Sequence, residues 1–514
     1  MDKDRIVYSK KVAVPRWLRD DSWFVCVVVI ALSVCGASPQ AFSAPPPLTD
    51  EELLDHTEAR AAQYFWDQTF STNGFVRDTT GAAYASIAAT GFGLAALVVI
   101  AERYHTSGEW TISPGLARLR AEQILSAAVA IQERQAADPS TYGTAGCLYH
   151  FIDAEGRRAG TSEVSTTDMA LLIAGTLTAG QYFGGQVQSL ADRFFRAVQW
   201  SYFLDRETGQ FYHAWKPERV SGYTVGAPNA RGGLSDLHWD RPTDEVLLLA
   251  LLALASDPFN QMFRESLYRW PRVVRRYKEY GVVSSYFGSL FTYLLGHAFF
   301  DFQSMGMDNP GAQGVASVEP VDWFLNARQA ILANRQFAID QATAFPTYSS
   351  EQWGLSACYR PDGTYFGANG AEPAENPPLL DGTLPPYTAI SAMPLLRISP
   401  HESLQDNLAF QALRHYYDRH FDGLWGPYGP RDSFVVAWEG NHLATRYTRL
   451  YVGIDVGPEV LMIENYRTAL IHRFFMSHPD ILAAVRMQFP AHDPRINQFP
   501  AVVHWDVHTV PDDK

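Results

Sequence analysis

Two acidic residues in this chain could carry out acid–base chemistry, and both lie beside aromatic and turn-forming residues. Glu245 ends the segment W-D-R-P-T-D-E, residues 239–245, and Asp432 lies within G-P-Y-G-P-R-D-S-F, residues 426–434. Hydrolysis of a glycosidic bond uses two carboxyl groups, one on each side of the bond. The sequence therefore predicts a glycosidase site if the fold brings these two residues together.

Glu245 is expected to be the proton donor because it lies in the first turn of an apolar helix. The ten residues that follow it, 246–255, are all apolar. Removing water from around a carboxyl group raises its pKa, which suits a general acid at neutral pH. Capping of this helix by Thr243 or Asp244 would leave the Glu245 side chain free to face a cavity.

Two further pairs of titratable residues each have a functional and a structural interpretation. Glu163 and Asp168 lie beside the start of an apolar helix at 169–175, where they could cap the helix or bind sugar hydroxyls. His297 and Asp301 are four residues apart on one face of an expected helix. Such a pair is more often a hydrogen-bonded core pair than a catalytic one.

Other chemistries lack their sequence motifs. There is no H-E-x-x-H or C-x-x-C pattern, no G-x-S-x-G nucleophile turn and no phosphate-binding G-x-x-x-x-G-K. We therefore expect no metal site and no cofactor. Cys147 and Cys358 are expected to be isolated buried thiols, with one disulfide between them as the alternative.

The N-terminal 44 residues have the pattern of an export signal. Basic residues precede an apolar run at 23–34, and small residues follow at 41–43. We expect a mature protein that begins near Ala44, has no transmembrane segment and lies in the periplasm or outside the cell. Cys35 ends a sequence similar to a lipoprotein box, so a lipid anchor is the alternative, although the bulky Val34 speaks against it.

The overall charge excludes one class of partner. The chain has 55 Asp and Glu against 41 Lys and Arg, for a net charge of −14. An acidic surface repels nucleic acid and anionic lipid, so neither is expected to bind.

Helical periodicity dominates the chain outside the export signal. Apolar residues recur at spacings of three and four, and some helices are apolar on all sides, as expected of an inner helix. An inner and an outer ring of helices would give this contrast, so we expect an all-α (α/α)6 toroid in a single domain, residues 45–514. The predicted helices are 51–70, 84–104, 114–134, 166–182, 243–255, 260–280, 286–302, 322–340, 402–420, 458–475 and 479–488.

Read in order, the short motifs of the chain resemble the glycoamylase-like domain of bacterial β-1,2-glucanases, the group around glycoside hydrolase family 144. The resemblance spans nearly the whole chain after residue 44 and depends on the number and order of the motifs. The matching segments are Tyr64-Phe65-Trp66, Gly91-Phe92-Gly93-Leu94, Tyr149-His150-Phe151, Gln181-Tyr182-Phe183, Trp215-Lys216-Pro217-Glu218, Trp353-Gly354-Leu355-Ser356-Ala357, Asp381-Gly382-Thr383, Asp432-Ser433-Phe434 and Ile463-Glu464-Asn465-Tyr466-Arg467.

This resemblance implies an inverting endo-hydrolase of β-1,2-glucan that needs no cofactor. Glu245 would match the acid that protonates the leaving oxygen, and Asp432 the base that activates water. Other side chains would line the cleft, with the tryptophans and the tyrosine as sugar platforms. These predicted lining residues are Asp168, Glu163, Trp215, His213, Asp301, Trp323, Trp353, Asp381 and Tyr387.

Departures from the family pattern keep other activities open. Thr243-Asp244 replaces Tyr-Asn before the acid, Pro430-Arg431 replaces Gly-Phe before the base, and Val435 replaces an Asn. These changes leave both carboxyl groups but alter their surroundings. The alternatives are a glycosyl-transferring enzyme, a hydrolase of another glucan linkage, and a catalytically silent glucan-binding protein on the same scaffold.

Overall fold

The computed structural model describes residues 45–226, 232–399 and 401–492. The predicted export signal and the lipid-anchor candidate Cys35 lie outside the described residues. Within them, the longer helices are α1 (Asp50–Asp67), α2 (Ile87–Arg103), α3 (Pro114–Arg134), α5 (Thr166–Phe183), α6 (Gly185–Arg196), α7 (Asp244–Ser256), α10 (Trp323–Gln341), α13 (Leu408–Leu424), α14 (Gly453–Thr468), α15 (Leu470–Ser477) and α16 (Pro479–Gln488).

Short elements connect these helices. The short helices are α4 (Pro139–Tyr142), α8 (Gln261–Ser266), α9 (Phe302–Met305), α11 (Tyr387–Ser391) and α12 (Met393–Leu396), with 3-10 turns η2 (Trp200–Tyr202), η3 (Leu290–Tyr293), η4 (Gly296–Ala298), η5 (Gly311–Gln313) and η6 (Leu404–Asp406). The strands are β1 (Ala85–Ser86), β2 (Phe151–Ile152), β3 (Val164–Ser165), β4 (Ala214–Lys216), β5 (Gly233–Leu234), β6 (Val274–Tyr277), β7 (Tyr280–Val283), β8 (Cys358–Tyr359), β9 (Tyr365–Phe366), β10 (Trp425–Gly426), β11 (Gly429–Pro430), β12 (Phe434–Glu439) and β13 (His442–Tyr447). The strands are short and form only small antiparallel sheets of two or three strands. Helices therefore dominate the described residues, which agrees with the predicted all-α class.

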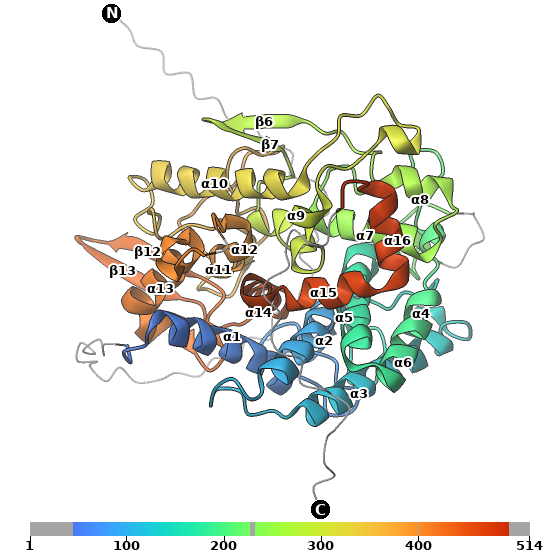
Figure 1. Cartoon of the computed structure of the whole chain (residues 1–514), viewed down its shortest axis with the longest axis horizontal. Helices are drawn as coiled ribbons and strands as arrows, with labels where there is room; N and C mark the ends of the chain where they lie inside the picture. The colour runs from blue at the N-terminus through green and yellow to red at the C-terminus, as the bar shows by residue number, and fades with distance from the viewer. Residues whose placement is uncertain (1–44, 227–231, 400, 493–514) are drawn as a thin grey trace, which may run out of the picture.

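Two kinds of helix build the molecule. Helices α2, α5, α7 and α14 are buried along most of their length, whereas α6 and α13 bury one apolar face. The buried helices pack side by side, with α14 against α2, α2 against α5 and α5 against α7. Figure 1 shows α2, α5 and α14 toward the middle of the molecule, with α3, α6, α10 and α13 around them.

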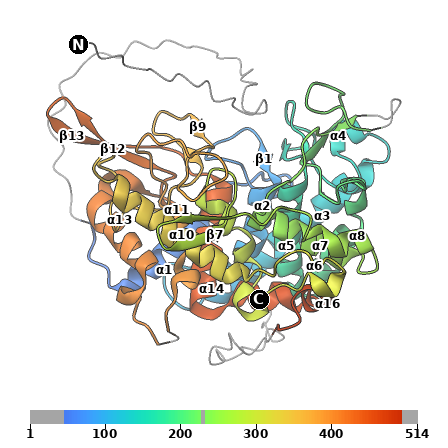
Figure 2. The same cartoon turned by 90° about the horizontal axis from the view of Figure 1, so that it is seen from above.

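Three of the four buried helices begin in a similar way, and this positions the candidate site. Ser86, Ser165 and Thr243 cap α2, α5 and α7, and each accepts a hydrogen bond from a backbone N–H of the first turn. Strand β1 leads directly into α2, and β3 leads directly into α5. In Figure 2, β1, β9, β12 and β13 lie along the upper side of the picture, and α14 and α16 lie below them.

Two of the predicted helices are wrong. Residues 260–280 form the short helix α8 and then enter the β6–β7 hairpin, because Pro271 cannot continue a helix and Lys278 has a positive φ of 50° at the turn. Residues 286–302 form η3, η4 and the start of α9. Gly288 has φ +63°, and a Cβ there would lie 1.9 Å from the Ala371 carbonyl oxygen. This close approach requires glycine and prevents a continuous helix.

The predicted helix at 458–475 is two helices, α14 and α15, which meet at Ala469. This residue has a left-handed backbone, φ 55° and ψ 30°, which ends α14 and starts α15 at a new angle. Cys147 and Cys358 are both buried and unpaired, as expected. Among the described residues, no helix combines the length and the apolar character needed to cross a membrane.

Candidate active site

Glu245 lies in the first turn of α7, where its neighbours leave it available for chemistry. Thr243 caps the helix, and the Asp244 Oδ2 atom lies 2.5 Å from Nδ1 of His297. The Glu245 side chain is partly buried. Burial, together with the charges of Asp168 and Asp244, raises the pKa of Glu245 to about 8. At neutral pH this carboxyl group therefore holds a proton, as predicted for a general acid.

His150 lies between two carboxylates next to Glu245. Its Nδ1 atom is 2.9 Å from Oε1 of Glu163, and its Nε2 atom is 3.3 Å from Oδ1 of Asp168. Burial opposes the charge on the imidazole, but Asp168 and Glu163 outweigh this effect and raise the pKa of His150 to about 9. Burial is also outweighed at Glu163, whose pKa falls to about 2 because of the hydrogen bond and charge of His150.

Asp432 lies between β11 and β12, and its carboxyl group is paired with another carboxyl group. The backbone N–H of Tyr359 donates to Oδ2 of Asp432 over 2.6 Å, and Asp455 in the first turn of α14 shares a side-chain hydrogen bond with it. Burial raises the pKa of Asp432 to about 6, and burial with the charge of Asp432 raises the pKa of Asp455 well above its usual range. Two adjacent carboxyl groups cannot easily both be charged, so this pair holds one proton.

Asp78 and Tyr365 connect the surroundings of Glu245 with those of Asp432. Asp78 is buried in the loop before α2; burial raises its pKa to about 6, with His150 and Asp168 as charged neighbours. The charge of Asp78 also acts on Asp432. Tyr365 on β9 is 59% exposed, and its phenol group is within reach of the charges of both Glu245 and Asp455. Because of these shared neighbours, we treat the two predicted catalytic residues as parts of one acidic cluster.

We call this cluster the acidic site. Each of its acids lies in the first turn of a buried helix or in a loop beside such a helix. A helix N-terminus favours negative charge, which offsets part of the cost of gathering acids there. The acidic site comprises Asp78, Asp168, Glu245, Asp432 and Asp455.

The three predicted tryptophan platforms are buried side chains, and this burial contradicts a role as exposed sugar-stacking surfaces. Trp353 is 0% exposed, Trp215 is 2% exposed and Trp323 is 3% exposed. Trp215 occupies the central strand of the β3–β4–β5 sheet, and the Trp323 indole donates to Oδ2 of Asp308 over 2.9 Å. Their size and flat shape fill the core between elements.

The prediction that Asp301 lines the substrate cleft is also wrong. Asp301 caps the short helix α9, where its Oδ1 accepts from the Ser304 N–H, and its own N–H contacts the sulfur of Met476. His297 lies in η4 and turns toward Asp244 instead of sharing a helical face with Asp301. The Asp301 side chain therefore has a capping role at a position packed against α15.

The other predicted lining residues differ in their burial and in their contacts with the acidic site. Tyr387 begins α11 and is 3% exposed, which contradicts its predicted role as a sugar platform; it hydrogen-bonds Ser356 Oγ at 2.9 Å and also bonds Asp455. Asp381 forms an ion pair with Arg360 at 2.5 Å on an exposed loop. His213 packs against Trp239 with ring centroids 4.1 Å apart and ring planes tilted by 38°, and burial lowers its pKa to about 4, so it is neutral at pH 7.

Sequence reasoning missed four residues of the acidic site and its border: Asp78, His150, Asp455 and Tyr365 were not predicted as site residues. Asp78 and His150 lie in segments before buried helices, and Asp455 lies in the first turn of one. A search for acids in the first turn of each predicted helix, or just before it, would have found Asp455, whereas Asp78 lies nine residues before α2 and has no such signal. Tyr365 lies on a short hairpin, β8–β9, for which the sequence gives no comparable signal.

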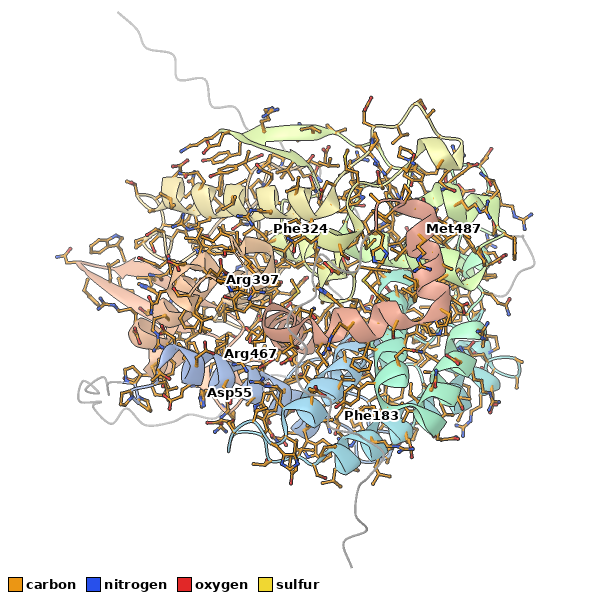
Figure 3. The ribbon with its side chains drawn as sticks, in the orientation of Figure 1. Asp55, Phe183, Phe324, Arg397, Arg467 and Met487 are labelled. Carbon is orange, nitrogen blue, oxygen red and sulfur yellow. The ribbon has the colours of Figure 1, made fainter. Side chains whose placement is uncertain are left out.

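A second group of buried charges lies toward the other end of α14, and here the acids have arginine partners. Arg467 is 3.1 Å from Asp55 and 3.2 Å from Glu58, and Arg103 is 2.9 Å from Asp55. Figure 3 labels Asp55 and Arg467, which lie near each other between α1 and α14. Glu464 on α14 completes this group, which we call the arginine cluster, with Arg103 at 3.8 Å.

Comparison with known proteins finds a matching family model and similar proteins. Residues 237–479 match the model of the Glycoamylase family, described as "Putative glucoamylase". The exo β-1,2-glucooligosaccharide sophorohydrolase of Parabacteroides distasonis is 25% identical over 502 residues, covering 90% of this chain. The chain spans 61% of the length of that relative. These matches agree with the resemblance to the glycoamylase-like family that the motifs predicted.

Solved structures share the fold. The endo-β-1,2-glucanase of Chitinophaga pinensis, in complex with sophorotriose and glucose, matches with a TM-score of 0.66 and 22% identity over 86% of this chain and 98% of that one. The β-1,2-glucanase of Parabacteroides distasonis matches with a TM-score of 0.65 and 21% identity over 86% of this chain and 60% of that one. The endo-β-1,2-glucanase of Talaromyces funiculosus, in complex with sophorose, matches with a TM-score of 0.60 and 13% identity over 85% and 90%.

Proposed function

We propose that this protein is an endo-acting glycoside hydrolase that cleaves β-1,2-glucan to sophoro-oligosaccharides by an inverting mechanism. Glu245 donates its proton to the oxygen of the leaving sugar. Asp432 takes a proton from water as the water oxygen bonds to the anomeric carbon. Inversion requires about 6.5 to 9.5 Å between the two carboxyl groups, which leaves room for that water.

One observation carries this proposal: two carboxyl groups of the acidic site have opposite protonation states at neutral pH. Glu245, with a pKa of about 8, holds its proton, whereas Asp432, with a pKa of about 6, has lost it. Separated pKa values of this kind identify the acid and the base of a pair. The family and the shared fold with β-1,2-glucanases support the choice of substrate.

The substrate is positioned, in this proposal, by groups around the two carboxyls. Tyr365 offers an exposed ring on which the apolar face of a sugar can pack. Asp168, held by His150, keeps a negative charge near Glu245 and so helps it to retain its proton. In this proposal the three buried tryptophans do not contact the substrate.

We further propose that residues 45–514 form one domain built as an (α/α)6 toroid. The packing order α14, α2, α5 and α7, with α11 against α14, supports an inner ring. In this arrangement η3 and η4, which contact α7, take the place of one inner helix. Export to the periplasm or the cell exterior, with cleavage near Ala44, is part of the same proposal. Mass spectrometry of the N-terminus and of Cys35 tests cleavage and lipidation.

The test of function is product analysis after incubation with linear β-1,2-glucan, by thin-layer chromatography and mass spectrometry. We expect a series of sophoro-oligosaccharides from the wild type and none from Glu245→Gln. Sophorose alone would instead indicate exo action. Cyclic or elongated products would indicate glycosyl transfer.

A matched control and a glucan panel separate the remaining alternatives. Glu464→Gln removes a buried acid of the arginine cluster and should leave the products unchanged. Cleavage of another glucan only would keep the fold and discard the linkage. Binding without cleavage of any glucan would favour the glucan-binding protein.

A further inference from the structure

We propose that Asp455 is a positioning residue, which keeps the proton of the Asp432–Asp455 pair and donates it as a hydrogen bond, so that Asp432 alone is ionised as the base. This inference rests on the proposed function, because it assigns a task to Asp455 in that reaction. It also explains why a second carboxyl group lies against a catalytic carboxylate.

The contacts of Asp432 carry the argument. Asp432 is 5% exposed, and its Oδ2 atom accepts from the Tyr359 N–H over 2.6 Å. In the part of the chain that the structure describes, its Oδ1 atom is buried and receives no N–H group or hydroxyl. Asp455 is the neighbouring side chain that hydrogen-bonds Asp432. A carboxylate can receive such a bond from another carboxyl group only if that group is protonated.

The surroundings favour a proton on Asp455. Burial and the charge of Asp432 favour a proton on Asp455 and outweigh the opposing hydrogen bond from Tyr387 on α11. The charge of Asp78 acts on both carboxyl groups. Tyr359 on β8 provides a backbone N–H to Asp432 but not to Asp455. Asp432 therefore has a backbone donor that stabilises its carboxylate, and the adjacent charge of Asp432 disfavours a second carboxylate at Asp455.

Other titratable groups face the pair without supplying a positive charge. They come from α1, α11, α14, β8 and β9. Within the described residues, no lysine or arginine forms an ion pair with either member. These facing groups are Tyr64, Tyr359, Tyr365, Tyr387, Cys358 and Glu459.

During hydrolysis, Asp432 accepts the proton of the attacking water while the water oxygen bonds to the anomeric carbon and Glu245 protonates the leaving oxygen. Asp455 keeps its proton throughout. Its hydrogen bond fixes the orientation of Asp432 and lets that carboxylate ionise in a buried place. An amide at position 455 can donate the same bond, whereas an apolar side chain of similar size cannot.

The experiment compares Asp455→Asn, Asp455→Leu and Asp432→Asn, with kcat and kcat/KM on linear β-1,2-glucan measured from pH 5 to pH 9. We expect Asp432→Asn to lose about 10² to 10⁴-fold in kcat, as for removal of a general base. Asp455→Asn should stay within about tenfold of the wild type, the scale of one altered hydrogen bond. Its acidic limb should keep its position.

Asp455→Leu should move the acidic limb of the profile to higher pH, because Asp432 loses a donor that stabilises its charge. Its activity should therefore fall more at pH 6 than at pH 8. Glu459→Gln is the matched control, since it replaces a buried acid one turn further along α14, and its acidic limb should not move.

Three results would overturn the inference. A loss in Asp455→Asn as large as in Asp432→Asn would mean that Asp455 must ionise. An unmoved acidic limb in Asp455→Leu, or an equal shift in Glu459→Gln, would mean that the hydrogen bond has no specific role. An inactive wild type, or full activity in Asp432→Asn, would contradict the proposed function itself. If Asp455→Leu does not fold, Asp455→Asn still decides between the two roles.

Discussion

Helix α14 contacts two groups of buried acids, one toward each end, and the two groups handle buried charge in different ways. In the arginine cluster, Asp55 and Glu58 face Arg467 at 3.1 and 3.2 Å. In the acidic site, at the other end, none of the described lysines or arginines forms an ion pair with Asp432 or Asp455. About 14 Å of helix rise separates Asp455 from Glu464.

This difference separates stability from chemistry. Asp55 lies between two arginines, so removing one of them leaves a costly buried charge, whereas burial still raises the pKa of Glu58 and Glu464 in the same cluster. Glu245 and the Asp432–Asp455 pair form no ion pair with a lysine or arginine within the described residues and reduce buried charge by holding protons. Perturbed groups beside a potential substrate site are typical of catalysis. We therefore expect substitutions in the acidic site to lower activity with little effect on stability. Substitutions in the arginine cluster should lower stability with little effect on activity.

The largest expected effect is the loss of activity when the acidic site loses a carboxyl group. Glu245→Gln should lower kcat by about 10² to 10⁴-fold, because it removes a general acid. Its melting temperature should stay close to that of the wild type, because Glu245 already holds a proton at pH 7. Glu464→Gln, in the arginine cluster, should keep wild-type kcat. Similar activity losses in both variants would remove the distinction between the two ends.

The arginine cluster should show the reverse pattern. Arg467→Met leaves Asp55 with fewer cations and Glu58 without its 3.2 Å partner. We expect a loss of roughly 3 kcal/mol in the free energy of unfolding, the scale for breaking a buried ion pair. Urea denaturation measures this loss, and kcat of the folded fraction should not change. A variant as stable as the wild type would show that the ion pairs contribute little.

Stability should fall as the pH rises from 5 to 9. Burial raises the pKa of Glu58 and of Glu245 to about 8, and the pKa of His150 is about 9. All three are above their unfolded values, so the folded protein holds more protons in this range and unfolding becomes easier as protons become scarce. We expect a decrease in melting temperature on the order of a few degrees.

A pair of variants checks the source of that slope. Glu58→Gln should flatten the dependence of melting temperature on pH, because it removes one of the raised groups. Glu133→Gln, at an exposed position, should leave the slope unchanged. A melting temperature that rises from pH 5 to pH 9 would contradict the directions of these pKa shifts.

The smallest expected effect concerns Tyr365. Tyr365→Ala should raise KM for long β-1,2-glucans by about two- to tenfold, the scale of one lost aromatic contact. Tyr365→Phe should keep the wild-type KM if the ring face is what binds. Trp438→Ala, at a side chain 63% exposed on the β12–β13 hairpin, is the control and should have no effect. Equal changes in KM for Tyr365→Ala and Trp438→Ala would show that Tyr365 has no specific role in substrate binding.

Much of the fold could be predicted because the helix signals are local. Thr243 followed by apolar residues gave the start of α7, and the capping residue did leave Glu245 free. The region around Gly288 could not be predicted in the same way. There the approach of the Ala371 carbonyl, more than 80 residues away in sequence, decides the backbone conformation.

The site was only partly predictable for a similar reason. An acid at a helix start carries a sequence signal, and this signal identified Glu245. Asp432 lies between two strands and was identified from its motif. Burial of an aromatic residue depends on the whole packed structure, so Trp353 looked like a sugar platform and is a core residue. Tyr365 was missed because a two-residue strand such as β9 leaves no periodic pattern.

The most direct test of the central claim is the dependence of kcat/KM on pH with linear β-1,2-glucan as the substrate. The pKa of Asp432, about 6, and that of Glu245, about 8, predict a bell-shaped profile with limbs near those values. The falling limb should be absent from the residual activity of Glu245→Gln. A flat profile between pH 5 and pH 9, or a falling limb that persists in Glu245→Gln, would contradict the assignment of Glu245 as the acid.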